Sequence, residues 1–282
     1  MVEMYDLFNE YVARITPTTW ELERARQHRD AVKDRLVALP GFKEFMNTGS
    51  YIRGTSLHPF ADIDLFVGYR LDGYDKDEEN IITRIHYHLG PSFPTSQVRL
   101  QTHSIGVLFS DGIRVDVVPG FEVQSKPGFY RVRDREKDEW TVSNIQGHKE
   151  FFDRCQSKDR RFRDMVRLVK AWKNGRRMKF SSYMLELLVA QCFRRGIPQG
   201  RDVALNEFFK WMTAGGFPWP ARVPDPTNAK HNVASELTRP AHLELISAAN
   251  YARARSGTAL SSSSRREAAR AWADVLDGFP PA

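Results

Sequence analysis

The chain has 282 residues, 41% hydrophobic and 27% charged, so it can bury a substantial core and has the composition of a globular protein. Its 42 Lys and Arg exceed its 35 Asp and Glu, and the net charge of +7 fits anionic ligands and leaves RNA open as a partner, although it can equally serve solubility alone. No apolar stretch has the length of a membrane span, and the first residues carry acids where a secretory signal carries bases. We therefore expect a cytoplasmic protein with no membrane partner. The cysteines, Cys155 and Cys192, form no metal-ligand cluster.

The first predicted element is a long helix over residues 20–39. Thr18-Thr-Trp-Glu21 has the form of a capping box, and apolar residues recur along one side of the run that follows. Pro40-Gly41 then ends the helix, and residues 42–46 lead to a Gly-Ser turn.

The next stretch, 48–67, carries two features that point to chemistry. Gly49 and Ser50 open a turn that can offer backbone N–H groups and a hydroxyl to a phosphate, although such a pair is more often only a turn. Asp62 and Asp64 lie two residues apart on an otherwise apolar strand, so both carboxylates leave the same face. Neighbouring carboxylates repel each other unless cations neutralise them, and hard oxygen ligands suit Mg²⁺ or Mn²⁺. His58, a lone loop histidine, is left outside the catalytic set.

Acidic residues also crowd the stretch 72–80, where a solvated helix entry is a better interpretation than a metal site. A helix over 81–89 follows it, and residues 97–109 are predicted to form one strand. Asp111-Gly112 then supplies a hairpin turn, which places Asp116 on the returning strand. Asp116 is therefore a candidate third carboxylate.

Residues 119–142 are mixed and charged, which indicates a hairpin and loop whose arginines either contact a nucleotide or pair with neighbouring acids. From Lys149 onward the pattern is helical, and residues 165–172 have an apolar core face from which Lys170 is expected to lie apart. The aromatic residues of 208–219 are predicted to be core. We expect a polar linker over 256–264 and a final helix over 265–276.

The Gly-Ser turn, eleven intervening residues, Asp-x-Asp and a distant strand Asp resemble the nucleotidyltransferases of the polymerase-beta-like superfamily. The later segments are similar to the helical half of the oligoadenylate synthetase and cyclic GMP-AMP synthase branch, which includes the bacterial CD-NTases. These segments are Phe162 to Lys173, Phe180 to Leu188, and Asp225-Pro-Thr-Asn228 with Asn232. The resemblance covers about residues 15 to 240.

The resemblance implies an α+β fold with two lobes. Residues 1–145 would form a catalytic lobe with a mixed β-sheet, residues 146–282 a helical lobe, and the long N-terminal helix a spine that joins them. The catalytic residues would be Asp62, Asp64 and Asp116, which together would hold two Mg²⁺ or Mn²⁺ ions. The substrate contacts would come from Gly49, Ser50, Lys170, Ser182 and Tyr183, of which Tyr183 stacks on a base. A lone helical lysine is otherwise more often a solvated surface group.

The implied activity is the condensation of nucleoside triphosphates into a cyclic di- or trinucleotide second messenger, with release of pyrophosphate, in bacterial anti-phage signalling. Three alternatives stay open: RNA tailing of the CCA-adding or poly(A) type, linear oligonucleotide synthesis, and an inactive nucleotide- or RNA-binding module. RNA tailing predicts an added RNA-binding domain, for which little chain follows Ala221. Intact Asp62, Asp64 and Asp116 disfavour the inactive module. We further expect a monomer, with a regulatory RNA or protein as a possible partner.

Overall fold

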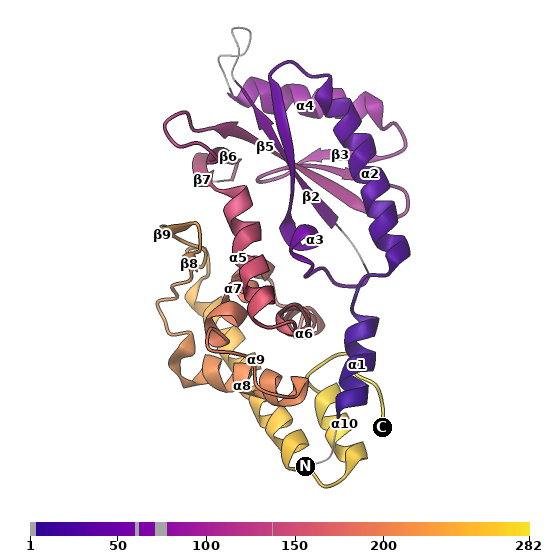
Figure 1. Ribbon diagram of the computed structural model, residues 1–282, viewed down its shortest axis with the longest axis vertical. Helices are drawn as coiled ribbons and strands as arrows, with labels where there is room; N and C mark the ends of the chain where they lie inside the picture. The colour runs from indigo at the N-terminus through magenta and orange to yellow at the C-terminus, as the bar shows by residue number, and fades with distance from the viewer. Residues whose placement is uncertain (1–3, 60–61, 71–77, 137) are drawn as a thin grey trace. The chain divides into compact units, whose positions relative to one another are not determined.

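The computed structural model describes residues 4–59, 62–70, 78–136 and 138–282 (Figure 1). The chain divides into two compact units: Pro17–Phe152, here called the sheet unit, and Met1–Thr16 with Asp153–Ala282, here called the helical unit. The predicted α+β class is confirmed. The predicted domain boundary between residues 145 and 146 stays a prediction. Most of the acidic stretch at 72–80 lies outside the described residues. None of the helices in the described ranges is long and apolar enough to cross a membrane.

A mixed sheet organises the sheet unit. Its strands are β1 (Phe42–Thr48), β2 (Asp62–Tyr69), β3 (Gln97–Leu100), β4 (Ile105–Leu108), β5 (Arg114–Glu122), β6 (Tyr130–Asp134) and β7 (Glu139–Ser143). Strand order is β1-β2-β5-β4-β3, with β6 paired to both β5 and β7. The pair β2 and β5 is parallel, whereas the other pairs are antiparallel. The predicted hairpins on either side of β5 are therefore confirmed.

The single strand predicted over 97–109 is wrong, because the segment folds into two strands, β3 and β4. The backbone N–H of Gln101 donates to the carbonyl of Ser104 at 2.8 Å and closes the turn between them. The four residues from Gln101 to Ser104 are all polar and interrupt the strand pattern, so they favour a turn over a continuous strand.

Two helices bury their apolar sides against one face of this sheet. They are α2 (Thr19–Val37) and α4 (Glu78–Ser92). The short helix α3 (Gly49–Arg53) follows β1 directly and precedes β2 in the chain. The core between them contains, among others, Ala25, Val32, Leu36, Ile82, Ile85, Leu89, Ile63, Leu65, Val67, Val115 and Val117. The capping box at Thr18 and Glu21 is present. Alternate residues of β2 and β5 thus lie in this core, and the residues between them face away from it.

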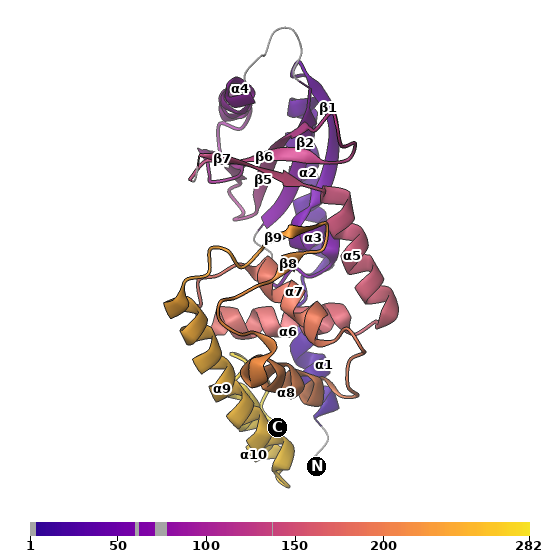
Figure 2. The same cartoon turned by 90° about the vertical axis from the view of Figure 1, so that its left-hand side faces the viewer.

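The helical unit follows α5 (Ile145–Lys158), within which the division between the units falls. Its elements are α1 (Tyr5–Arg14), α6 (Phe162–Gly175), α7 (Ser182–Cys192), α8 (Arg201–Trp211), the π-helical turn η1 (Met212–Gly216), β8 (Pro224–Asp225), β9 (Asn228–Asn232), α9 (Arg239–Ser261) and α10 (Arg265–Ala273). Helices α9 and α10 pack against each other (Figure 2).

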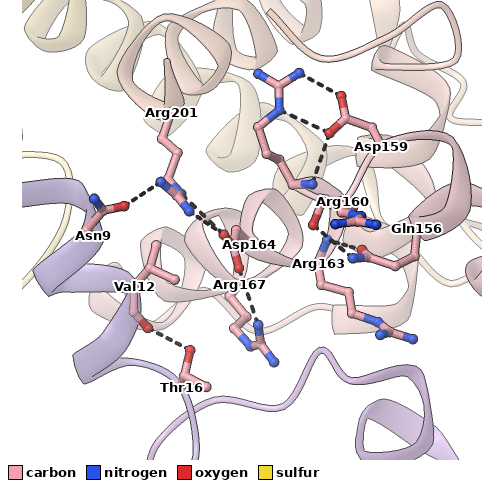
Figure 3. Close-up of polar contacts among 11 residues, drawn as sticks. Asn9, Val12, Thr16, Gln156, Asp159, Arg160, Arg163, Asp164, Arg167 and Arg201 are labelled. Atoms are coloured by element: carbon pink, nitrogen blue, oxygen red, sulfur yellow. Dashed lines mark hydrogen bonds and ion pairs between the residues drawn. The ribbon is translucent and has the colours of Figure 1, made fainter. Parts of the chain in front are cut away.

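Helix α1, which the sequence analysis missed, is fixed to the helical unit by polar contacts. The Arg201 guanidinium donates to Asn9 Oδ1 at 2.7 Å and to Asp164 Oδ2 at 2.6 Å, so one side chain joins α1, α6 and α8 (Figure 3). The Phe8 ring also lies edge-on to Trp272 at 4.9 Å. The N-terminal segment therefore contributes two helices, α1 to the helical unit and α2 to the sheet unit.

The polar linker predicted over 256–264 is also wrong, because α9 continues to Ser261. Ser256 is fully buried in that helix, accepts from Asn206 Nδ2 at 2.6 Å and donates to the carbonyl of Ala252 at 2.7 Å. A small hydroxyl that bonds within its own helix and to α8 suits a close helix contact. The aromatic cluster is core as predicted at Phe208, Phe209 and Phe217, whereas Trp219 is 42% exposed.

Candidate active site

Strands β2 and β5 bring the predicted carboxylates together. Asp62 and Asp64 lie on β2 and Asp116 lies on β5, and in the parallel register Asp64 is opposite Asp116 while Asp62 is opposite Arg114. Because side chains alternate along a strand, all these polar groups leave the face opposite the α2 and α4 core. The structure therefore groups the acids as the Asp-x-Asp spacing predicts.

Arg114 is the cation of this acidic group, here called the carboxylate cluster. Its Nε lies 2.9 Å from Asp116 Oδ1 and 3.0 Å from Oδ2, and its Nη2 lies 3.3 Å from Asp62 Oδ2. In this arrangement, no three His, Cys, Asp or Glu side chains of the described residues are placed together as metal ligands. The donor chemistry nonetheless fits a divalent cation, because the carboxylates already gather around one positive group.

The carboxylate cluster disfavours the ionised form of Asp64 and so raises its pKa. Burial, together with repulsion from Asp62 and Asp116, raises the pKa of Asp64 to about 7, although the Arg53 and Arg114 cations oppose the rise. Arg53 is itself 8% exposed and lies over the Phe152 ring at 5.2 Å. A carboxylate held at high pKa by burial and like charge is stabilised in its ionised form when a cation binds.

Asp116 is less exposed than Asp62 and Asp64, at 6% exposure. Burial raises its pKa, while the Arg114 cation and a hydrogen bond from Gln101 oppose the rise. The Gln101 side-chain amide donates to Asp116 Oδ1 at 3.1 Å. Two different elements thus hold this carboxylate: its own strand β5 and the β3–β4 turn.

The Gly-Ser turn lies directly against the carboxylate cluster. Gly49 has φ +69°, and an ideal Cβ at this position would lie 1.5 Å from Asp64 Oδ2, so only glycine fits beside the acid. Ser50 follows in α3, and its Oγ lies 3.1 Å from the Oγ of Ser56. The predicted phosphate-binding turn therefore adjoins the predicted metal ligands.

Two lysines near the end of α6, Lys170 and Lys173, lie in the part of the chain that also carries Ser182 of the predicted triphosphate site. Lys170 was expected to lie off the core face, which is wrong: it is 7% exposed, and its Nζ lies 3.4 Å from Glu186 Oε1. Lys173 Nζ donates to Ser182 Oγ at 3.0 Å. Burial and the charge of Lys170 lower the pKa of Lys173. Two ammonium groups with a hydroxyl beside one of them are a basic site that an anion would stabilise.

Tyr183 follows Ser182 in the first turn of α7 and is half-buried. That helix begins where Ser181 Oγ accepts from the backbone N–H of Met184 at 3.3 Å. The residues after Tyr183 are buried, so the ring lies at the edge of the helical core. Its stacking role stays a prediction.

Two other predicted features have local partners. Asp225 accepts from the backbone N–H and the hydroxyl of Thr227 at 2.7 Å each, and Asn232 bonds the backbone of Val223 and Ala221, as expected of residues that brace a turn. His58 Nδ1 lies 2.9 Å from the Glu21 carboxylate, and its exclusion from the catalytic set stays a prediction.

Three residues of these sites were not predicted from the sequence as functional groups: Arg114, Lys173 and Gln101. Arg114 precedes Asp116 by two positions on one strand face, and Lys173 follows Lys170 by three on one helix, so periodicity could have identified both. Gln101 carries no such signal, because its position depends on a turn that the pattern concealed.

The chain matches a known protein family. Residues 2–155, more than half of the chain, match the SMODS family, described as the Second Messenger Oligonucleotide or Dinucleotide Synthetase domain. The chain belongs to the SMODS family. The predicted resemblance to the CD-NTases is confirmed, and so is the enzyme class, a nucleotidyltransferase that makes oligonucleotide second messengers.

Two known proteins that match the chain are distant from it in sequence. The chain is 24% identical over 232 residues to the CBASS oligonucleotide cyclase CdnC of Escherichia coli (strain KTE188), which covers 72% of this chain and 73% of CdnC. It is 25% identical over 243 residues to the CCA-adding enzyme of Saccharolobus islandicus (strain M.14.25 / Kamchatka #1), covering 81% of this chain and 54% of that enzyme.

Solved structures are similar over nearly the whole chain. E. coli MS115-1 CdnC with ATP has a TM-score of 0.83 at 21% identity and covers 98% of each chain. The CdnC:HORMA-deltaN complex has a TM-score of 0.83 at 20% identity, covering 99% of this chain and 98% of the other. These matches establish the two-lobed fold.

Proposed function

We propose that this protein is a metal-dependent nucleotidyltransferase that condenses nucleoside triphosphates into a cyclic di- or trinucleotide and releases pyrophosphate, as a second messenger in bacterial anti-phage signalling. The observation that carries the proposal is the parallel register of Asp64 and Asp116, with Asp62 beside them and Gly49 against Asp64. Family membership and the similarity to CdnC support it.

Asp62, Asp64 and Asp116 would hold two Mg²⁺ or Mn²⁺ ions. When bound, such ions lower the pKa of the acceptor hydroxyl and neutralise charge on the triphosphate. Asp64 must then give up its proton, which its pKa of about 7 makes easy near neutral pH. Arg114 now contacts both Asp62 and Asp116, so its guanidinium would compete with a cation for these carboxylates. Little covalent chemistry is left to the protein, which positions and neutralises the reacting groups.

The donor triphosphate would be bound by Gly49, Ser50, Lys170 and Ser182, to which the contacts in α6 add Lys173. Lys173 supports this role because it is partly desolvated, close to a second cation, and bonded to the Ser182 hydroxyl. A phosphate oxygen would relieve the repulsion between the lysines. Tyr183 would stack its ring on the base.

A second candidate function is addition of nucleotides to RNA. The 25% identity to a CCA-adding enzyme favours it, whereas the chain spans about half of that enzyme's length, 54%. The two functions share the carboxylate chemistry and differ in the acceptor: a second nucleotide in one case and an RNA 3′ end in the other.

We also propose a cytoplasmic monomer that is regulated by a protein or RNA partner. The complex of CdnC with HORMA-deltaN supports a protein partner. The excess of cations lies in the helical unit, which has 24 Lys and Arg against 15 Asp and Glu, while the sheet unit has 18 against 20.

The experiment is to incubate the purified protein with each combination of NTPs and Mg²⁺, with or without tRNA lacking its CCA end, and to identify products by mass spectrometry. Cyclic products resist phosphatase because they have no terminal phosphate, whereas linear products lose phosphates. A phosphatase-resistant di- or trinucleotide is expected. Elongated tRNA with no small product would instead establish the tailing function.

A further inference from the structure

The third carboxylate of the proposed site, Asp116, is held by a side chain from outside its own strand. Gln101, in the turn between β3 and β4, donates from Nε2 to Asp116 Oδ1 at 3.1 Å. Asp116 is 6% exposed, so water has little access to the carboxylate that accepts this hydrogen bond from Gln101. An amide donor on a buried carboxylate limits its rotation and favours its ionised form.

The amide of Gln101 is itself oriented. Ser104 Oγ donates to Gln101 Oε1 at 3.0 Å, which turns the NH₂ group of the amide towards Asp116. The backbone N–H of Gln101 donates to the carbonyl of Ser104 at 2.8 Å, so the two residues are fixed to each other by main chain and side chain. The relay from Ser104 through Gln101 to Asp116 therefore has one defined direction.

Gly106 makes room for this relay. It is opposite Asp116 in the β4–β5 register, and an ideal Cβ there would lie 2.2 Å from Gln101 Nε2 and 3.1 Å from Asp116 Oδ1. Its φ is outside the left-handed region, so the backbone conformation does not call for glycine. Glycine within a strand weakens it, and close approach of another group is a usual reason for its presence. Here the approaching group is the Gln101 amide.

From this arrangement we infer that Gln101 is a positioning residue for Asp116, with Ser104 and Gly106 as its supports. It sets the orientation of the carboxylate before a divalent cation binds, because it bonds Oδ1 from outside β5 while Arg114 contacts the carboxylate from within that strand. This inference rests on the proposed function, in which Asp116 is a metal ligand. Loss of a partner that orients a metal ligand typically weakens metal affinity by about 10- to 100-fold.

The test compares Gln101→Met with Gln97→Met, a matched change at an exposed position of the same hairpin. Each protein is titrated with Mn²⁺ alone by calorimetry, and its melting temperature, kcat and KM for ATP are measured. Gln101→Met should weaken Mn²⁺ binding by about 10-fold or more and lower kcat more than it raises KM. Gln97→Met should match the wild type in every measurement.

Ser104 supplies a second, milder test. Ser104→Ala removes the donor that orients the amide and should weaken Mn²⁺ binding by less than Gln101→Met, whereas Ser104→Thr keeps a hydroxyl and should restore it. If Gln101→Met does not fold, this pair decides the matter.

Wild-type Mn²⁺ affinity and kcat in Gln101→Met and Ser104→Ala would overturn the positioning role, even if the melting temperature falls, because such a fall alone marks a purely structural contact. A wild-type protein that neither binds Mn²⁺ nor releases pyrophosphate would instead overturn the proposed function.

Discussion

Gly49 lies so close to Asp64 that an ideal Cβ on Gly49 would be 1.5 Å from Asp64 Oδ2. The phosphate-binding turn and the central carboxylate of the proposed site are therefore built against each other. A side chain at residue 49 must move the acid, the turn or both.

Gly49→Ala should consequently abolish most activity. Gly112→Ala is the matched control, because Gly112 also has positive φ, +86° against +69°, but nothing lies within 4 Å of its ideal Cβ. Gly112→Ala should lose about 1–2 kcal/mol of stability through backbone strain, and Gly49→Ala should lose more because its Cβ also meets Asp64. Pyrophosphate release should fall by about 100-fold or more in Gly49→Ala alone, as for a lost catalytic contact. Equal activity in the two variants would show that the turn and Asp64 act independently.

Asp64 should destabilise the metal-free protein above pH 7. Its folded-state pKa of about 7 exceeds the ordinary 3.8, so the folded state binds this proton more tightly, and stability falls as the pH rises from about 4 to 7. Asp64→Asn removes that penalty and should raise the free energy of unfolding by about 2–4 kcal/mol at pH 8 in EDTA. The gain should be smaller at pH 5, where Asp64 keeps its proton. Denaturant unfolding at both pH values measures it, and an identical gain at both would contradict the shifted pKa.

Both lysines of α6 should contribute to NTP binding, and Lys170 should also stabilise the fold through its ion pair with Glu186. Lys173→Ala removes a charge-assisted phosphate contact worth about 1.5–3 kcal/mol, so the KM for NTP should rise by about 10-fold or more at little cost in stability. Lys170→Ala removes the buried ion pair with Glu186, a loss of about 3–5 kcal/mol of stability. We also expect it to raise the KM by about 10-fold where it folds.

Lys210→Ala, at a lysine whose side chain is 50% exposed, is the control for both lysine variants. NTP affinity that is unchanged in Lys170→Ala and Lys173→Ala would remove both lysines from the triphosphate site.

Tyr183 is tested by two substitutions. Stacking needs the ring and not the hydroxyl and is worth about 1–3 kcal/mol per base, so Tyr183→Phe should be nearly silent and Tyr183→Ala should weaken NTP binding. A core aromatic would instead lose about 3–5 kcal/mol of stability on truncation. Thermal melts with and without NTP distinguish the two. A Tyr183→Ala protein that melts much lower but keeps its full ligand-induced shift would rule out stacking.

The carboxylate cluster could be predicted because strand alternation and the Asp-x-Asp spacing fix which side chains share a face. The burial of Lys170 could not be predicted, because it depends on Glu186, sixteen residues away on α7. The periodicity of one helix carries no information about its contacts with another helix. The β3–β4 turn was concealed because residues 97–100 and 105–108 share strand character. Gln101 was lost with that turn. The end of α9 was predicted as a linker because serines favour linkers in isolation, whereas Ser256 here bonds Asn206 of α8.

The most direct test of the account is the rate of pyrophosphate release from NTPs with Mg²⁺ by the wild type, Asp64→Asn and Asp138→Asn. The last is the control, because the Asp138 side chain is 86% exposed. Asp64→Asn keeps the volume of the side chain but removes the charge that would hold the cations, and turnover should fall by about 10³-fold. Asp138→Asn should turn over like the wild type. Near-normal turnover by a folded Asp64→Asn protein would contradict the assignment of the carboxylates as the catalytic site.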